Sequence, residues 1–192
     1  MMQQSDFNLV IVGVGGQGTL LASRILGYLA MEAGNDVKVS EVHGMSQRGG
    51  SVITYVRVGQ EVASPIVAMG DADYLLSFEA LEAVRAAGYL KPQGIVITNT
   101  QRISPMPVIT GAVAYPSEPL SMLKDYRVQS MNALHMAEKS GSGKAVNLVL
   151  LGALSRYLNY SLEDWTKAIT ACVPPKTLQI NLKAFESGRN AE

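Results

Sequence analysis

A glycine-rich turn follows the first apolar run of the chain and has the spacing of a phosphate-binding motif. Residues 7–12 (FNLVIV) are typical of a buried strand and residues 19–33 of an apolar helix, with G-x-G-x-x-G between them. The first glycine permits a tight turn, the second lets a ligand approach the backbone, and the third lets helix and strand pack closely. Unpaired N–H groups at the helix start favour an anion. The candidate binding residues are Gly13, Gly15, Gly16, Gln17 and Gly18.

Two interpretations of this turn remain open. Glu41 ends a second strand expected over residues 36–41, where an acid would bind the ribose of a dinucleotide. Alternatively, the glycines only shape a tight turn and close packing, and they face a cofactor held by a partner. The sequence contains no second glycine-rich mononucleotide half, which favours the second interpretation because dinucleotide folds normally carry two halves.

The loop over residues 43–50 (HGMSQRGG) is the densest polar cluster in an otherwise apolar half of the chain. It begins just past an expected strand, where open α/β sheets bind ligands. Arg48 offers a planar fork to a phosphate or carboxylate, and His43 can donate, accept or shuttle a proton, so both are catalytic candidates. The alternative is a solvated connection whose glycines set the turn. The candidate binding residues here are Ser46, Gln47, Arg48, Gly49 and Gly50.

Metal and redox chemistry find few ligands in this sequence. Cys172 is the single cysteine, so the chain can hold neither an iron–sulfur cluster, which normally needs four cysteines, nor an internal disulfide. His43 and His135 are far apart and form no metal-ligand pattern. Any electron carriers must therefore lie on another polypeptide.

Gly70-Asp71, with Asn99 some two dozen residues later, partly matches the thiamine diphosphate and magnesium signature. The final glycine of that signature is replaced by Ala72, and the second asparagine by Thr100. We interpret this partial match as a chance one.

The elements that would position these groups alternate between strand and helix and then become helical. Further strands are expected over residues 51–58, 74–78 and 94–98, with one more within 108–115, and helices are expected over residues 79–87, 131–140, 145–158 and after Pro175. Ser161 with Asp164 resembles a capping box that opens another helix. This order predicts an α/β fold, a Rossmann-like sandwich around a largely parallel sheet with a helical C-terminal third.

Several side chains are expected to pack inside this sandwich. Leu81 and Val84 share one face of their helix, and we interpret His135 and Cys172 as packing residues. The helix over residues 145–158 is apolar nearly all round, which marks a buried or interface helix. Asn147 within it either satisfies a buried backbone group or faces a subunit.

Length and composition limit the class of protein. With 192 residues, a single domain over residues 1–192 is expected, and the 16 basic and 16 acidic residues cancel, which argues against nucleic-acid binding. Charged residues make up 17%, below the roughly 25% of ordinary soluble chains, so another subunit is expected to cover part of the surface. The sequence contains no run long enough to span a membrane and no signal peptide, so a cytoplasmic location is expected.

The glycine turn and the polar loop together resemble the gamma-subunit family of 2-oxoacid:ferredoxin oxidoreductases, and within it the small (beta) subunits of the indolepyruvate enzymes. The long EVHGMSQRGG block is the most specific part of the resemblance, which covers essentially the whole chain. The remaining matching segments are residues 78–83 (FEALEA), Asn99-Thr100, residues 144–147 (KAVN), residues 151–154 (LGAL), Asn181, Ala184-Phe185 and Gly188.

The resemblance implies a heteromeric enzyme that oxidatively decarboxylates an arylpyruvate, passing the acyl group to coenzyme A and the electrons to ferredoxin. In such complexes thiamine diphosphate, its Mg ion and the iron–sulfur clusters are associated with the large (alpha) subunit. The turn and the loop would then form a wall beside that subunit's site, where they close it or receive coenzyme A phosphates.

Two rival functions remain open at this point. One is a free-standing NAD-dependent enzyme or sensor, in which Glu41 would favour NAD through the ribose hydroxyls. The other is a purely structural subunit whose glycines and apolar helix serve only assembly.

Overall fold

The computed structural model describes residues 6–44 and 50–191 and contains a six-stranded sheet in the order β2-β3-β1-β4-β5-β6. β1 pairs in parallel with β4, β4 with β5, and β5 with β6, whereas β3 is antiparallel to both β1 and β2. β2 therefore runs in the same direction as β1, and a single antiparallel strand interrupts a largely parallel sheet. The strands are β1 Phe7–Val14, β2 Asp36–His43, β3 Ser51–Gly59, β4 Ala72–Ser77, β5 Leu90–Asn99 and β6 Arg127–Met131.

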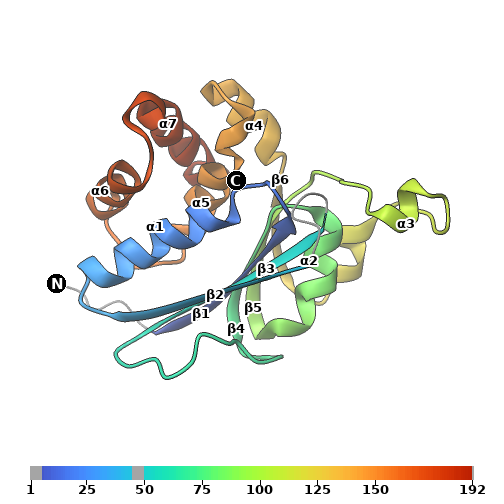
Figure 1. Ribbon diagram of the computed structural model, residues 1–192, viewed down its shortest axis with the longest axis horizontal. Helices are drawn as coiled ribbons and strands as arrows, with labels where there is room; N and C mark the ends of the chain where they lie inside the picture. Colours follow the sequence, from blue (N-terminus) through green and yellow to red (C-terminus); the bar gives the residue numbers. More distant parts are fainter. Residues whose placement is uncertain (1–5, 45–49, 192) are drawn as a thin grey trace.

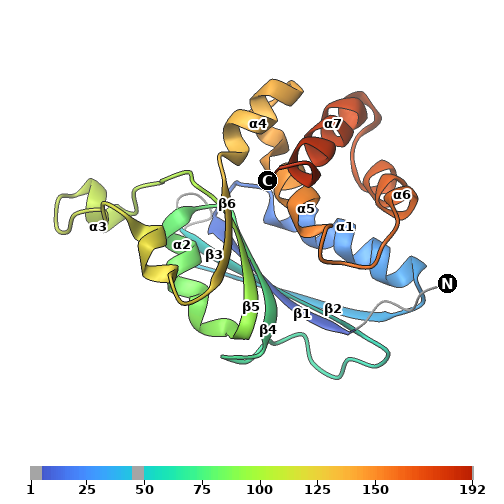
Figure 2. The same cartoon turned by 180° about the vertical axis from the view of Figure 1, so that it is seen from behind.

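Helices cover the two faces of the sheet unequally. On one face lie α1, α4, α5, α6 and α7, and on the other lies α2 with a 3₁₀ turn, η2 (Figures 1 and 2). The predicted α/β sandwich with a helical C-terminal third is confirmed. The helices are α1 Thr19–Glu32, α2 Ala80–Ala86, α3 Met106–Ile109, α4 Ala133–Ser140, α5 Val146–Leu154, α6 Leu162–Cys172 and α7 Leu178–Arg189, and the 3₁₀ turns are η1 Ala87–Tyr89, η2 Pro119–Leu123, η3 Gly143–Ala145 and η4 Pro175–Thr177.

Central strand β1 is buried on both faces, which explains its continuous apolar sequence. Leu9 and Ile11 point into the core beneath the C-terminal helices. Val10 and Val12 point into the core beneath α2. The strand thus joins two cores and holds the glycine turn rigidly at its carboxyl end.

Helices α5 and α7 cross with their backbones in contact. A Cβ atom on Gly152 would lie 2.0 Å from the carbonyl oxygen of Phe185, and one on Gly188 would lie 1.8 Å from that of Val149. Every residue of α5 is buried, which is the buried alternative expected for this helix. The close crossing lets a helix without polar faces lie between the sheet and α7.

The strand predicted within residues 108–115 is wrong. Pro105 and Pro107 start the short helix α3 instead, because proline lacks the N–H of a sheet ladder and its fixed φ suits the first helical turn. Gly111, with φ of +77°, then turns the chain back. The sixth strand is β6, which the sequence analysis missed because its residues (RVQSM) are mixed in polarity and half exposed at the sheet edge.

The predicted packing of individual side chains is partly correct. The buried face of α2 carries Ala80, Ala83 and Ala86, whereas Leu81 and Val84 are only half-buried, since small side chains let the helix lie close to the sheet. His135 is exposed in the first turn of α4 and is not a packing residue. The capping box that begins α6 is present, and half-buried Cys172 at its end contacts the core.

None of the helices in residues 6–44 and 50–191 combines the length and apolarity that a bilayer crossing requires.

The α5–α7 contact predicts a large difference between two chemically identical substitutions. Gly188→Ala places a methyl group against the backbone of Val149, so we expect the free energy of unfolding to fall by about 1–3 kcal/mol or more. Gly27→Ala in α1 meets no atom within 4 Å and should leave stability unchanged or raise it by up to about 1 kcal/mol. Urea unfolding followed by circular dichroism measures both, and equal midpoints would contradict the prediction.

Candidate functional site

The glycine turn joins the carboxyl end of β1 to α1 through left-handed backbone. Gly16 has φ of +98° and Gly18, the residue that precedes α1, has φ of +90°. Both conformations favour glycine strongly. A Cβ on Gly18 would also lie 2.9 Å from the side-chain nitrogen of Asn147. The spacing is therefore explained at these two positions by backbone conformation and by close packing on α5.

The side chain of Gln17 folds back and fills the inside of the turn. Its Oε1 accepts a 2.7 Å hydrogen bond from the backbone N–H of Val14, and its Nε2 donates to the carbonyl oxygen of Phe78 at 3.2 Å and to Oε1 of Gln101 at 3.4 Å. A Cβ on Gly13 would lie 2.9 Å from Oε1 of Gln17. Gly13 thus makes room for an amide of this chain, which stabilises the turn without a ligand.

Asn99 extends this amide network from β5 to α4 and is fully buried. Its Nδ2 donates to the carbonyl oxygen of Phe78 and to Oε1 of Gln101, both at 3.2 Å. Its Oδ1 accepts from the backbone N–H of Ala133 at 3.1 Å. Side-chain amides therefore bind together the carboxyl ends of β1, β4 and β5 and the start of α4.

Asn147 settles one of the open sequence interpretations. Its Nδ2 donates to the carbonyl oxygen of Gly18 at 3.4 Å. Of the two roles expected for this residue, the structure therefore shows the first, in which the side chain satisfies a backbone group. This contact also ties the glycine turn to the buried helix α5.

The loop after β2 starts at the same edge of the sheet as the glycine turn and ends in contact with it. In the sheet register Val52 lies between His43 and Gly13, and the backbone N–H of Gly15 donates to the carbonyl oxygen of Gly50 at 2.9 Å. Exposed His43 is the last residue of β2, and its Nδ1 lies 3.0 Å from the carbonyl oxygen of Gly44. The other candidates in this loop, Ser46, Gln47, Arg48 and Gly49, lie outside the described residues.

Glu41 does not occupy the position of a ribose-binding acid. Strand β2 continues past it to His43, and β3 lies between β1 and β2. Its carboxylate accepts hydrogen bonds from the hydroxyls of Thr54 at 3.0 Å and Thr19 at 3.3 Å, so it lies at the first turn of α1. Its negative charge opposes a phosphate at that helix start. This geometry disfavours the free dinucleotide interpretation.

The residues of the thiamine-like match are separated by the length of the sheet. Gly70 and Asp71 precede the start of β4, whereas Asn99 ends the parallel neighbouring strand β5. These residues lie at opposite edges and do not fit a common cofactor. Among the residues that the structure describes, no cluster of three or more His, Cys, Asp or Glu is suited to a metal ion.

Two buried glutamates that sequence reasoning did not single out as site residues support this edge. Glu79, 1% exposed, precedes α2 and accepts from the backbone N–H groups of Leu81 at 2.7 Å and Glu82 at 2.9 Å through Oε2. Its Oε1 accepts from the N–H of Ile103 at 3.0 Å and from the hydroxyl of Tyr115 at 2.5 Å. The available signal was an acid directly after an apolar strand and before a helix, the position of an N-cap.

The same carboxylate affects its neighbour. Burial and, secondarily, the hydrogen bond to Glu79 raise the pKa of the Tyr115 hydroxyl well above its ordinary value.

Glu82 is the second buried glutamate at this edge. It accepts hydrogen bonds from the hydroxyl of Ser51 at 2.5 Å and from Arg85 at 2.6 Å, and so anchors the residue that follows Gly50.

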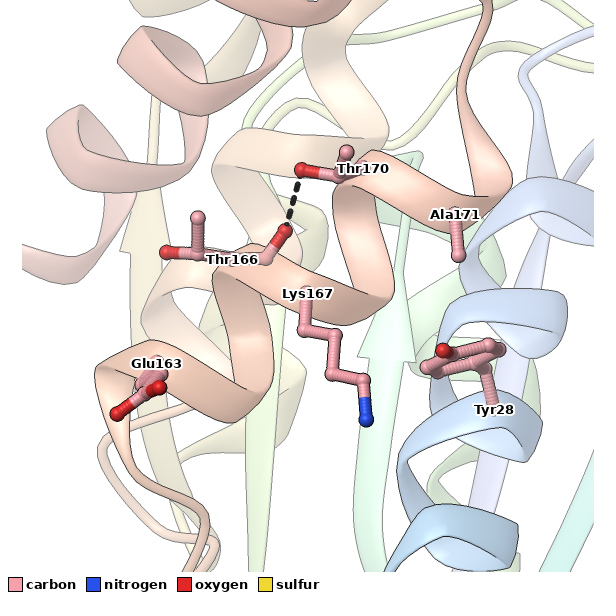
Figure 3. A pocket seen from close by; sticks show the side chains of 6 residues that line it. All are labelled: Tyr28, Glu163, Thr166, Lys167, Thr170 and Ala171. Carbon is pink, nitrogen blue, oxygen red and sulfur yellow. Dashed lines mark hydrogen bonds between the residues drawn. The ribbon is translucent and has the colours of Figure 1, made fainter.

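A hollow elsewhere on the molecule lacks the features of a specific site. About 640 Å³ in volume, it lies between α1 and α6 and opens broadly to solvent (Figure 3). Lys167 in its wall pairs with Glu32, both partly exposed, a kind of surface pair worth about 0–1 kcal/mol. The hydroxyl of Thr170 donates back to the carbonyl oxygen of Thr166 in the same helix. These polar groups do not converge on a ligand.

The sequence profile of the family described as pyruvate ferredoxin/flavodoxin oxidoreductase matches residues 8–191. The indolepyruvate oxidoreductase subunit IorB of Thermococcus kodakarensis is 44% identical over 195 aligned residues, which cover 97% of this chain and 96% of that protein.

Two solved structures have the same fold. The gamma subunit of a keto/oxoacid ferredoxin oxidoreductase from Geobacter sulfurreducens superposes with a TM-score of 0.70 at 24% identity, covering 95% of each chain. A 2-oxoglutarate:ferredoxin oxidoreductase from Magnetococcus marinus, with 2-oxoglutarate, coenzyme A and succinyl-CoA bound, superposes with a TM-score of 0.72 at 19% identity. The match covers 96% of this chain but only 30% of that one, so the same fold there forms one part of a longer polypeptide.

The amide network predicts a marked effect of Asn99→Ala. This change leaves the N–H of buried Ala133 without its acceptor, so we expect the free energy of unfolding to fall by about 1–3 kcal/mol. The control Asn190→Ala makes the same chemical change at an exposed position and should alter it by less than about 0.5 kcal/mol. Urea unfolding provides the measurement, and similar losses in the two variants would rule out a structural role for the network.

Proposed function

Because the chain belongs to the pyruvate ferredoxin/flavodoxin oxidoreductase family, we propose that it is the small subunit of a heteromeric 2-oxoacid:ferredoxin oxidoreductase acting on indolepyruvate or a related arylpyruvate. The complex decarboxylates the 2-oxoacid oxidatively, transfers the acyl group to coenzyme A and reduces ferredoxin. The 44% identity to an indolepyruvate oxidoreductase subunit over nearly the full length of both chains supports this substrate class.

The large subunit holds the cofactors in this proposal. One cysteine in 192 residues cannot bind an iron–sulfur cluster, and the thiamine-like residues lie at opposite edges of the sheet. Thiamine diphosphate with its Mg ion supplies carbanion stabilisation, and the clusters supply one-electron transfer. This chain's own part is to position and enclose, through rigid groups at the carboxyl edge of its sheet.

One observation carries the proposed site: the bond from the N–H of Gly15 to the carbonyl oxygen of Gly50, which joins the glycine turn to the polar loop. With His43 in register two strands away, both sequence motifs belong to one edge. We assign this edge as the wall that faces the large subunit's active site. The structure of a related enzyme with coenzyme A bound supports coenzyme A as the ligand class.

Arg48 is the proposed anion-binding group of this wall. The start of α1 already carries the carboxylate of Glu41, so the helix terminus is a poor site for a further negative charge. A guanidinium from the adjoining loop can instead form a paired hydrogen bond with a coenzyme A phosphate. Gly49 and Gly50 then serve to let backbone and ligand approach each other, while the turn glycines accommodate Gln17 and Asn147 of this chain.

In the reconstituted complex, Arg48→Ala should raise the KM for coenzyme A about tenfold or more, since a charge-assisted hydrogen bond contributes about 1.5–3 kcal/mol. The KM for the 2-oxoacid should change much less. Arg24→Ala, at an exposed position of α1, is the matched control. Steady-state kinetics with both substrates varied is the measurement, and an unchanged coenzyme A KM and turnover would remove Arg48 from the site.

A second prediction separates the subunit from an independent enzyme. The purified chain alone should not reduce viologen with indolepyruvate and coenzyme A, whereas the complex with the large subunit should. Calorimetry on the isolated chain should detect no micromolar affinity for NAD, because Glu41 is engaged by two hydroxyls at the start of α1. Viologen reduction or micromolar NAD binding by the chain alone would favour the dinucleotide-dependent alternative.

A further inference from the structure

A segment between β5 and η2 projects from the body of the molecule. We define residues 103–117 as the arm, whose helix α3 stands clear of the other elements in both views (Figures 1 and 2). None of the residues of α3 is buried, so the helix contributes little to the core. Contacts at its base and within the segment must therefore hold the arm in this conformation.

The base of the arm is fixed by groups of the candidate site. The buried carboxylate of Glu79 accepts hydrogen bonds from the backbone N–H of Ile103, where the chain enters the arm, and from the hydroxyl of Tyr115, where the chain returns. Outside this contact, Arg102 pairs with Glu118 at 3.8 Å, and its guanidinium lies 5.9 Å from the ring centroid of Tyr115. The exposed ion pair contributes little, so Glu79 is the main anchor.

The backbone of the arm satisfies its own polar groups. Ile109 donates to the carbonyl oxygen of Pro105 at 3.0 Å, Thr110 to that of Met106 at 2.9 Å, and Ala112 to that of Pro107 at 2.9 Å. Since proline also limits the backbone freedom of a loop, binding through this segment costs less ordering entropy than binding through an open loop. The arm is therefore a preformed element and not merely a connection between β5 and η2.

The surface of the arm is uncharged and exposes several large apolar side chains. Met106, Ile109 and Val113 are 63%, 65% and 56% exposed. Residues 103–117 contain no Asp, Glu, Lys, Arg or His, whereas the flanking positions are Arg102 and Glu118. Exposed apolar side chains gathered on a projecting element without charge indicate an interaction surface rather than a solvated loop.

We infer that the arm inserts into an uncharged apolar groove on the large subunit, an inference that rests on the proposed function. Glu79 binds the base of the arm through Ile103. Gln101, two residues before the arm, belongs to the same amide network as Gln17. A partner that covers the proposed wall therefore reaches the arm without a break. In the longer Magnetococcus marinus chain this fold is 30% of the polypeptide, so other parts of that chain are covalently joined to it. In the proposed heteromeric complex the large subunit is a separate chain, so surface contacts hold it.

The first test measures assembly. The tagged chain is co-expressed with the large subunit, captured, and the retained large subunit is quantified. We expect the double variant Met106→Asp/Ile109→Asp to retain at least tenfold less large subunit than the parent chain, because burial of two carboxylates in an apolar groove is costly. Its melting temperature should stay that of the parent chain, since neither residue is buried. Ile66→Asp, at a 50% exposed isoleucine before β4, is the matched control and should retain the partner.

The second test measures accessibility and does not depend on disrupting the interface. In a Cys172→Ser background, Val113→Cys and Ile66→Cys each provide one thiol at an exposed position. Alkylation by iodoacetamide should be at least tenfold slower at position 113 in the complex than in the isolated chain, and equal in both at position 66.

The outcomes distinguish the arm from the proposed function. If the parent chain retains no large subunit, the proposed function fails and the inference with it. If the parent retains it and the double variant does so equally, with position 113 unprotected, only the arm inference is overturned. Light scattering on the isolated chain covers the remaining possibility. A dimer that the double variant dissociates, with the large subunit still bound, would assign the arm to a second copy and overturn the inference.

Discussion

The carbonyl oxygen of Phe78 lies just past the end of β4, where the parallel ladder no longer supplies donors, and it accepts hydrogen bonds from the side-chain amides of Gln17 and Asn99. A buried carbonyl without a donor costs about 1–3 kcal/mol, so the end of the central sheet needs these groups. The carboxylate of Glu79 does the same for the N–H groups at the start of α2. Through these shared partners the carboxyl edge is one connected polar structure, and the turn, the amides and the base of the arm all depend on it.

This arrangement gives the glycine motif another meaning than its spacing suggests. A phosphate-binding turn leaves room inside for a ligand, whereas here the amide of Gln17 fills the turn from within. The antiparallel strand β3 separates β1 from β2, and Glu41 contacts the start of α1 instead of a ribose. The motif correctly predicts strand, turn and helix, because left-handed φ and close packing require glycine with or without a nucleotide.

Local patterns predicted most of the fold. Apolar runs located β1, β3 and β5, and the Ser161–Asp164 pair located the start of α6, because these signals depend on neighbours in sequence. The features that were missed depend on distant residues. Gln17 meets Gln101 across 84 positions, and Tyr115 meets Glu79 across 36. Strand β6 was missed for a similar reason, since a half-exposed edge strand owes its conformation to the neighbour it pairs with.

The antiparallel strand has a consequence for how such a subunit can diversify. Parallel neighbours must be joined by a crossover of a dozen or more residues, usually through a helix, whereas β2 and β3 are consecutive antiparallel neighbours and need only a hairpin connection. The residues between Gly44 and Gly50 can therefore change in length and composition without moving any helix, because the strand ladder and the bond from Gly15 to Gly50 fix both ends. In a fold built this way, the side chains at one edge of the sheet can change while its two cores stay the same.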